Sequence, residues 1–284
     1  MVLLVSDFRP DSCVVAEVKA SPNHGERKGD AKPDMVVLHY TGMRDFKLAL
    51  EHLCSPLSEV SAHYVVMEDG HIVQCVPESR RAWHAGASSW AGETDVNSRS
   101  IGIEIANPGH DYGYPDFPRR QIAATIALCR SIFTRHRIPA DRVVAHSDIA
   151  PSRKKDPGEK FPWRLLHDSG IGLWVKPIPV TAAGGRIFVL GDADPEVQTL
   201  QTSLRHLGYG IETTGSYDSE TMAVVAAFQR HHRPAKVDGI ADVSTVATLG
   251  ALLTAREPRV NGASPSGTST KGAPIAATLV KGAA

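Results

Sequence analysis

The chain has 284 residues, more than one hydrophobic core usually organises, so we expect one large and one small domain. Lysine and arginine together number 31, and so do aspartate and glutamate, which leaves no global charge to attract nucleic acid or a membrane surface. Any ligand must therefore be recognised by a local site.

The N-terminus predicts no export signal and no membrane span. Its apolar run is interrupted by Asp7 and Arg9, which is too early for the apolar core of a secretory signal, and no later stretch reaches transmembrane length. We therefore expect a cytoplasmic protein. The 4 cysteines are far apart and lack the short paired spacing of zinc or redox motifs, so we expect reduced thiols.

The first 174 residues predict strands interleaved with helices. Unbroken apolar runs flanked by Pro and Gly indicate buried strands, and apolar residues at helical spacing indicate amphipathic helices. This pattern is typical of an α/β protein with a mixed central β-sheet flanked by helices. We expect strands within 33–42, 100–107 and 142–148, a hairpin over 62–76, and helices over 45–54 and 118–137.

Beyond a Pro- and Gly-containing linker at 175–186, the composition changes to that of a small three-helix bundle over 187–255. Asp218 and Asp242 each precede a helical pattern, where an aspartate caps the exposed N–H groups of the first turn. Residues 256–284 have too little apolar content to fold, so we expect a disordered tail. The apolar face of the first bundle helix is predicted to comprise Val197, Leu200, Leu204 and Leu207.

Two histidines and an aspartate stand out as candidate metal ligands. His39 and His146 end apolar strand runs, and Asp156 precedes Pro157 and Gly158, which stiffen and turn the chain. Two histidines and a carboxylate leave one open position on a tetrahedral zinc ion, as catalytic zinc requires. The alternative, an Asp-Pro-Gly turn and two core histidines, fits the spacing equally well.

Two further residues are candidates for a catalytic role. Glu104 lies between apolar neighbours in the strand 100–107, and a buried carboxylate needs a partner or a function. Burial raises the pKa of a carboxyl, which suits a group that takes a proton from an attacking water. Lys154 is placed to stabilise an oxyanion, whereas Arg153 and Lys155 are expected to be solvated.

The stretch 80–92, "RRAWHAGASSWAG", predicts a loop with two tryptophans around His84. Flat aromatic rings suit sugar rings, so Trp83, Trp90 and His84 are candidate substrate-binding residues. The alternative is a loop held in place by two half-buried indoles.

The motifs "MVVLHYTG", "SAHYVV", "AWHAGASSW", "SIGIEIAN" and "AHSDIAPSRKKDPG" occur in the order seen in zinc-dependent N-acetylmuramoyl-L-alanine amidases, which are related in fold to the peptidoglycan recognition proteins. Residues 20–168 resemble that bacterial family, and the C-terminal part resembles a three-helix peptidoglycan-binding domain. The resemblance implies one zinc ion per chain on His39, His146 and Asp156. It also implies that Glu104 and Lys154 assist hydrolysis of the amide between N-acetylmuramic acid and L-alanine, and that His63 is structural.

Three alternatives stay open on the sequence. The chain is also compatible with a non-catalytic muropeptide-binding protein or with another zinc hydrolase. Its two-domain organisation resembles an envelope branch of the family, so the periplasm is the alternative location. Preference for 1,6-anhydro ends, stem-peptide specificity, glycan binding by the bundle and the oligomeric state are not indicated by any pattern.

Overall fold

The computed structural model describes residues 8–29, 31–180 and 187–256. The first seven residues, the second half of the predicted linker and nearly all of the predicted C-terminal tail lie outside the described residues. Within the described part of the chain, no helix is both long and apolar enough to cross a membrane.

A mixed six-stranded sheet forms the first part of the chain, as predicted, with the strand order β1-β5-β4-β7-β3-β8. β4 and β5 form the predicted antiparallel hairpin, and β4, β7, β3 and β8 run parallel to one another. A separate two-stranded sheet pairs β2 with β6. The strands are β1 (Glu17–Val18), β2 (His24–Glu26), β3 (Met35–Tyr40), β4 (Tyr64–Val66), β5 (Ile72–Gln74), β6 (Arg80–Ala82), β7 (Ser100–Ile105) and β8 (Val143–Ala145).

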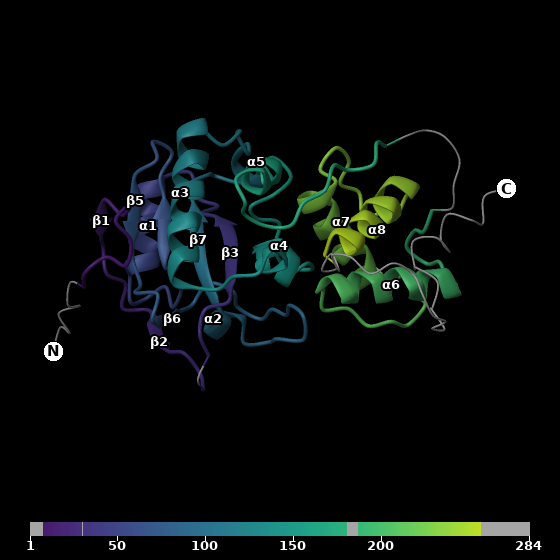
Figure 1. Cartoon of the computed structure of the whole chain (residues 1–284), viewed down its shortest axis with the longest axis horizontal. Coiled ribbons are helices and arrows are strands. Elements are labelled where there is room, and N and C mark those ends of the chain that lie inside the picture. Colours follow the sequence, from purple (N-terminus) through teal and green to yellow (C-terminus); the bar gives the residue numbers. More distant parts are fainter. Residues whose placement is uncertain (1–7, 30, 181–186, 257–284) are drawn as a thin grey trace, which may run out of the picture.

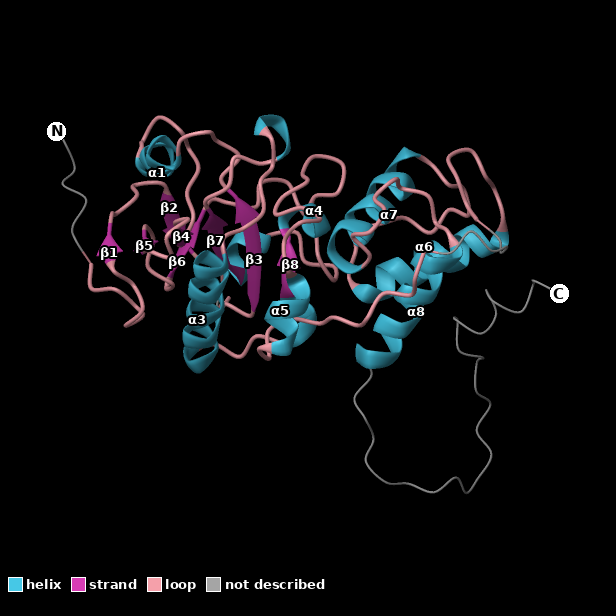
Figure 2. Cartoon of the chain, turned by 90° about the horizontal axis from the view of Figure 1, so that it is seen from above, coloured by secondary structure: helices cyan, strands magenta, loops and turns pink. Residues whose placement is uncertain are grey.

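Helices cover both faces of the large sheet, with α3 and α5 on one face and α1 on the other (Figures 1 and 2). The alternation of side chains along each strand divides the core accordingly. Ile101, Ile103 and Ile105 of β7 pack in the cluster that contains the buried side of α3, whereas Val65 of β4 packs with Leu50 of α1. The helices of this part are α1 (Phe46–Cys54), α2 (Val96–Arg99), α3 (Arg119–Arg135), α4 (His146–Ile149) and α5 (Trp163–Asp168), with single 3-10 turns at His110–Tyr112 and Ala140–Arg142.

The predicted three-helix bundle consists of α6 (Pro195–Leu207), α7 (Ser219–His232) and α8 (Val243–Arg256). The predicted apolar face of α6 is fully buried. Asp218 and Asp242 accept hydrogen bonds from the backbone N–H groups of Thr221 and Thr245, both at 2.8 Å, so the predicted caps are confirmed.

The bundle packs against the β8 side of the sheet (Figure 2), and one hydrophobic cluster contains residues of both parts. Met35, Val37 and Val144 of the sheet belong to the same cluster as the interior of the bundle. The division of the chain into domains at 175–186 stays a prediction.

Two local assignments differ from the expectation. The strand predicted over 142–148 ends at Ala145, and His146 begins α4, because the side chain of Asp148 accepts the Ala145 N–H at 2.8 Å and turns the chain into a helix. The predicted loop 80–92 begins as a strand, since Arg80–Ala82 pairs with His24–Glu26.

Candidate metal centre

The carboxyl ends of three adjacent parallel strands form the base of the site. His39 lies near the end of β3 and is paired in register with Glu104 of β7, so both side chains lie on the same face of the sheet. β8 is the neighbour of β3 on its other side, and His146 follows its last residue. Parallel strands place their carboxyl ends at one edge, which explains why residues so far apart in sequence meet.

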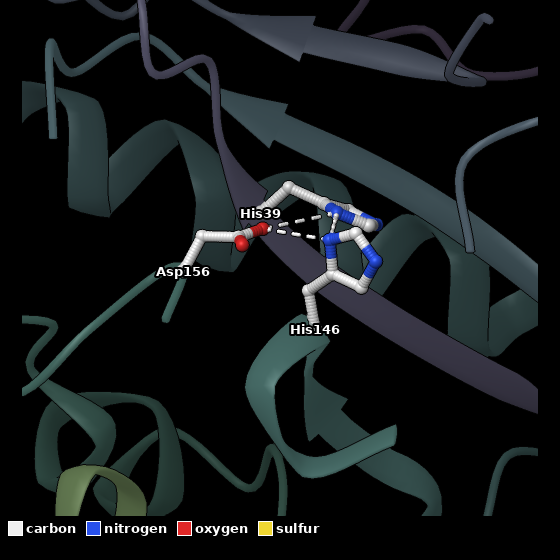
Figure 3. Close-up of side chains that lie close together, drawn as sticks. All are labelled: His39, His146 and Asp156. Atoms are coloured by element: carbon white, nitrogen blue, oxygen red, sulfur yellow. Dashed lines mark hydrogen bonds and ion pairs between the residues drawn. The ribbon is translucent and has the colours of Figure 1, made fainter. Parts of the chain in front are cut away.

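His39, His146 and Asp156 converge, as predicted, and all three are buried. The Nδ1 atoms of the two imidazoles are 2.9 Å apart, and Oδ2 of Asp156 lies 3.2 Å from Nδ1 of His39 and 3.0 Å from Nδ1 of His146 (Figure 3). Ligand atoms about 2.0–2.1 Å from a tetrahedral zinc ion lie about 3.4 Å from one another. The three atoms are therefore close enough together to share one metal ion, although their separations are shorter than that value.

The protonation states of these groups also suit a metal. Burial and the adjacent His146 lower the pKa of His39 to about 4. Burial alone raises the pKa of Asp156, but its interactions with His146 and His39 hold that pKa far below its usual value. A metal ligand must be deprotonated, and at neutral pH this set provides a neutral imidazole and a carboxylate.

A chain of hydrogen bonds fixes which nitrogen of His39 is free. Ser100 Oγ donates to the carbonyl of Val96 at 2.6 Å, so it accepts from Nε2 of His84 at 3.1 Å. Nδ1 of His84 then accepts from Nε2 of His39 at 3.0 Å, which leaves the lone pair of His39 Nδ1 facing Asp156.

His146 is fixed in the same way from the other side. Its Nε2 donates to the carbonyl of Ala85 at 3.2 Å, which leaves Nδ1 as the acceptor nitrogen. Arg153 donates to the same carbonyl at 3.2 Å and to that of Ala87. Arg153 is exposed, as the sequence predicted, but it also holds this loop through those two bonds.

The loop that carries Asp156 is shaped by close packing. Gly158 has φ of 87°, and a Cβ at this position would collide with the Tyr114 ring. The Tyr114 hydroxyl donates to the carbonyl of Pro157 at 2.7 Å and accepts from the N–H of Lys160 at 3.0 Å. The Asp156–Pro157 peptide is cis.

A cavity of about 360 Å³ opens beside these ligands and is lined by Glu104, Lys154, Trp83 and His84. Glu104 borders the cavity and is the one residue of β7 that is not fully buried. Its Oε2 is buried and has no hydrogen-bond partner among the described residues. Burial and the neighbouring Asp156 raise the pKa of Glu104 well above its usual value, against the opposing effect of Lys154.

The three candidate substrate-binding residues of the 80–92 stretch differ in their position relative to the cavity. Trp83 borders the cavity. His84 also borders it, but both of its ring nitrogens are used in the chain between Ser100 and His39. Trp90 lies outside the cavity lining: its indole is 3% exposed, packs edge-to-face on Tyr209 with ring centroids 5.0 Å apart, and donates to a backbone carbonyl in the 3-10 turn at Ala140–Arg142. Of the two readings of Trp90, the structure favours the buried indole that holds its loop.

His63 lies in the core, where Nδ1 accepts from the N–H of Gly102 at 3.0 Å and Nε2 lies 3.0 Å from the carbonyl of Arg80. Sequence reasoning missed Ser100, because one small polar residue at a strand start carries no signal. It also missed the wall formed by α1, where Ala49, His52 and Leu53 line the cavity.

Family models match both parts of the chain: the N-acetylmuramoyl-L-alanine amidase family over residues 29–159, and a peptidoglycan binding domain over residues 193–249. The chain is 38% identical to the N-acetylmuramoyl-L-alanine amidase AmiD of Escherichia coli over 77% of this chain and 82% of AmiD. It is 34% identical to the 1,6-anhydro-N-acetylmuramyl-L-alanine amidase AmpD of Enterobacter cloacae over 52% of this chain and 86% of that protein.

Two solved structures are similar over most of the chain. The complex of E. coli AmiD with anhydro-N-acetylmuramic acid-L-Ala-D-gamma-Glu-L-Lys gives a TM-score of 0.65 at 35% identity and covers 82% of this chain and 98% of that one. AmpDh3 of Pseudomonas aeruginosa in complex with anhydromuramic pentapeptide gives a TM-score of 0.65 at 31% identity, covering 84% of this chain and 95% of that one.

Proposed function

The chain belongs to the N-acetylmuramoyl-L-alanine amidase family, and on that premise we propose that its metal site holds zinc and that Glu104 and Lys154 carry the proton and charge changes of the reaction. The observation that supports this is the convergence of His39, His146 and Asp156 at the end of a cavity that also contains a buried carboxyl and a lysine. The bond cleaved is the amide between the lactyl carbonyl of N-acetylmuramic acid and the nitrogen of L-alanine.

Two imidazole nitrogens and one carboxylate oxygen are a donor set that zinc binds, and three protein ligands leave a position for water or substrate. When bound, zinc polarises the substrate carbonyl and favours deprotonation of the attacking water. His39 and His146 hold their free nitrogens toward this position because their other nitrogens are bonded elsewhere.

Glu104 acts as the proton carrier. Its raised pKa makes it a better base than an ordinary carboxylate. Its Oε2, which has no hydrogen-bond partner within the described part of the chain, is available to accept the proton of the attacking water. The same proton then passes to the departing nitrogen of L-alanine, so the carboxyl returns to its starting state. Lys154 contributes a positive charge beside the carbonyl oxygen as negative charge develops there.

The substrate class follows from the cavity and from the relatives. AmiD and AmpDh3 are both known in complex with anhydromuramyl peptides. Trp83 lines the cavity, and its aromatic ring is a surface on which a sugar ring can pack. We therefore propose that muramyl peptides bind with the sugar near Trp83 and the scissile amide beside Glu104.

The test is mass spectrometry of a muropeptide mixture with both ordinary and 1,6-anhydro ends, after incubation with the zinc-loaded protein and with chelator-treated protein. Release of peptides that begin at L-alanine, abolished by the chelator and restored by zinc, is the expected result. The end that is consumed faster gives the preference. Equal release with and without chelator would contradict the metal role.

A further inference from the structure

Asp148 is a fully buried carboxylate at the contact between the sheet and the bundle. Its Oδ2 accepts from the N–H of Ala145 at 2.8 Å and from Nδ1 of His231 at 2.6 Å, and its Oδ1 accepts from the hydroxyl of Tyr209 at 2.7 Å. A buried carboxylate is costly unless such partners are present. Two of the three partners come from the bundle, so the amidase part alone does not satisfy this group.

Asp148 belongs to the short helix that carries a metal ligand. α4 is four residues long and begins with His146. The bond from Asp148 to the Ala145 N–H closes its first turn, and the N–H of Ser147 donates to the carbonyl of Asp156 at 3.0 Å. A shift of α4 would therefore move both His146 and Asp156.

The two bundle donors are themselves held rigidly. The His231 ring stacks on Trp163 with centroids 3.7 Å apart and on His232 at 3.8 Å. The Tyr209 ring packs edge-to-face on Trp90. Both rings are almost fully buried, so their donor atoms are fixed before any ligand binds.

We propose that Tyr209 and His231 of the bundle are positioning residues for the metal centre, because through Asp148 they fix α4 and with it the placement of His146 and Asp156. The inference rests on the metal site proposed above and goes beyond it. The bundle then contributes to the amidase site through Asp148, whether or not it also binds glycan.

The test compares two matched substitutions in the full chain, Tyr209→Phe and Tyr217→Phe. Both tyrosines are buried in the bundle, but the Tyr217 hydroxyl donates to the carbonyl of Gly239 at 2.7 Å and does not contact Asp148. Each protein is stripped of metal, its folding is verified by circular dichroism, and zinc affinity is measured by competition with a chromophoric chelator. We expect the zinc Kd to rise about tenfold in Tyr209→Phe, the lower end for loss of a group that supports a ligand, and to change less than about twofold in Tyr217→Phe.

A second pair keeps the test decisive if Tyr209→Phe does not fold. His231→Leu removes the donor to Asp148, whereas His231→Asn keeps an N–H near the position of Nδ1, so the asparagine variant is expected to bind zinc more tightly than the leucine variant. Equal zinc affinity in all variants and the wild type would overturn the inference and leave the metal site standing. Absence of zinc binding by the wild type itself would instead overturn the metal site, and the inference with it.

Discussion

Replacing Glu104 by glutamine separates proton transfer from metal binding. Glutamine has the shape of glutamate but cannot accept the proton of the attacking water at neutral pH. Glu104 is not one of the three converging ligands, and its buried Oε2 makes no hydrogen bond within the described residues, so the substitution breaks no existing interaction of that atom. We expect the variant to retain its zinc.

The expected loss in kcat is about 10²- to 10⁴-fold, the usual contribution of a positioned general acid–base. Since each factor of ten corresponds to about 1.36 kcal/mol, the activation free energy should rise by about 2.7–5.4 kcal/mol. The stability of the fold should not decrease with the rate. Because burial raises the pKa of Glu104, its ionised form opposes folding at neutral pH, and the metal-free glutamine variant should unfold at the same temperature as the metal-free wild type or higher.

The assay combines three measurements on the purified variant: turnover of a muramyl peptide by liquid chromatography, zinc content by atomic absorption, and thermal unfolding in the presence of a chelator. Near-normal turnover with a full zinc complement would remove Glu104 from the mechanism. A low rate accompanied by loss of zinc would also refute the reasoning, since it would make Glu104 a support of the metal site rather than a proton carrier.

Other predictions address the surroundings of the site and the stability of the fold. Ser100→Ala removes the acceptor for His84, so zinc should bind about 10- to 100-fold more weakly, whereas Ser203→Ala, which removes a buried hydroxyl bonded to a helix carbonyl, should leave zinc affinity unchanged; a chelator competition with both variants checks this. Saturating zinc should raise the unfolding temperature of the metal-free protein, and a scan that shows no shift would refute binding to the folded state. Burial raises the pKa of Glu78, but hydrogen bonds from Arg135 and two neighbouring side chains lower it from 4.5 to about 2. Because this folded-state pKa is depressed, Glu78 should stabilise the fold by about 3 kcal/mol above pH 4.5 and lose that contribution as the pH falls toward 2. Urea unfolding at several pH values should therefore show a shallower acid loss in Glu78→Gln, and identical curves would contradict it.

The ligand set was predictable because the order of parallel strands in a sheet determines which strand ends lie side by side. His39 and His146 end apolar runs, and once β3, β7 and β8 are parallel neighbours their carboxyl ends must coincide. Glu104 was predictable from the cost of a carboxyl within an apolar strand. The sequence alone did not separate a metal site from a turn and two core histidines, since spacing carries no distances.

What sequence reasoning missed depends on contacts that span elements. Trp90 has the same glycine-rich surroundings as Trp83, but it packs on Tyr209 of the bundle, and no local pattern indicates that contact. One signal in the sequence could have indicated the position of His84. Gly102 lies within a strand, where a glycine often marks the close approach of another group. A Cβ there would lie 2.5 Å from Cγ of His84, so the missing side chain provides the space for the imidazole.

The contacts of the bundle with α4 make the metal site depend on both parts of the chain. A carboxylate inside α4 requires donors, and a short helix cannot supply them from its own backbone beyond the first turn. Tyr209 and His231 supply them from the bundle, at positions that are already fixed by aromatic packing. If the zinc affinity follows those two donors, the metal centre extends across the contact, and its ligand geometry depends on the fold of both parts.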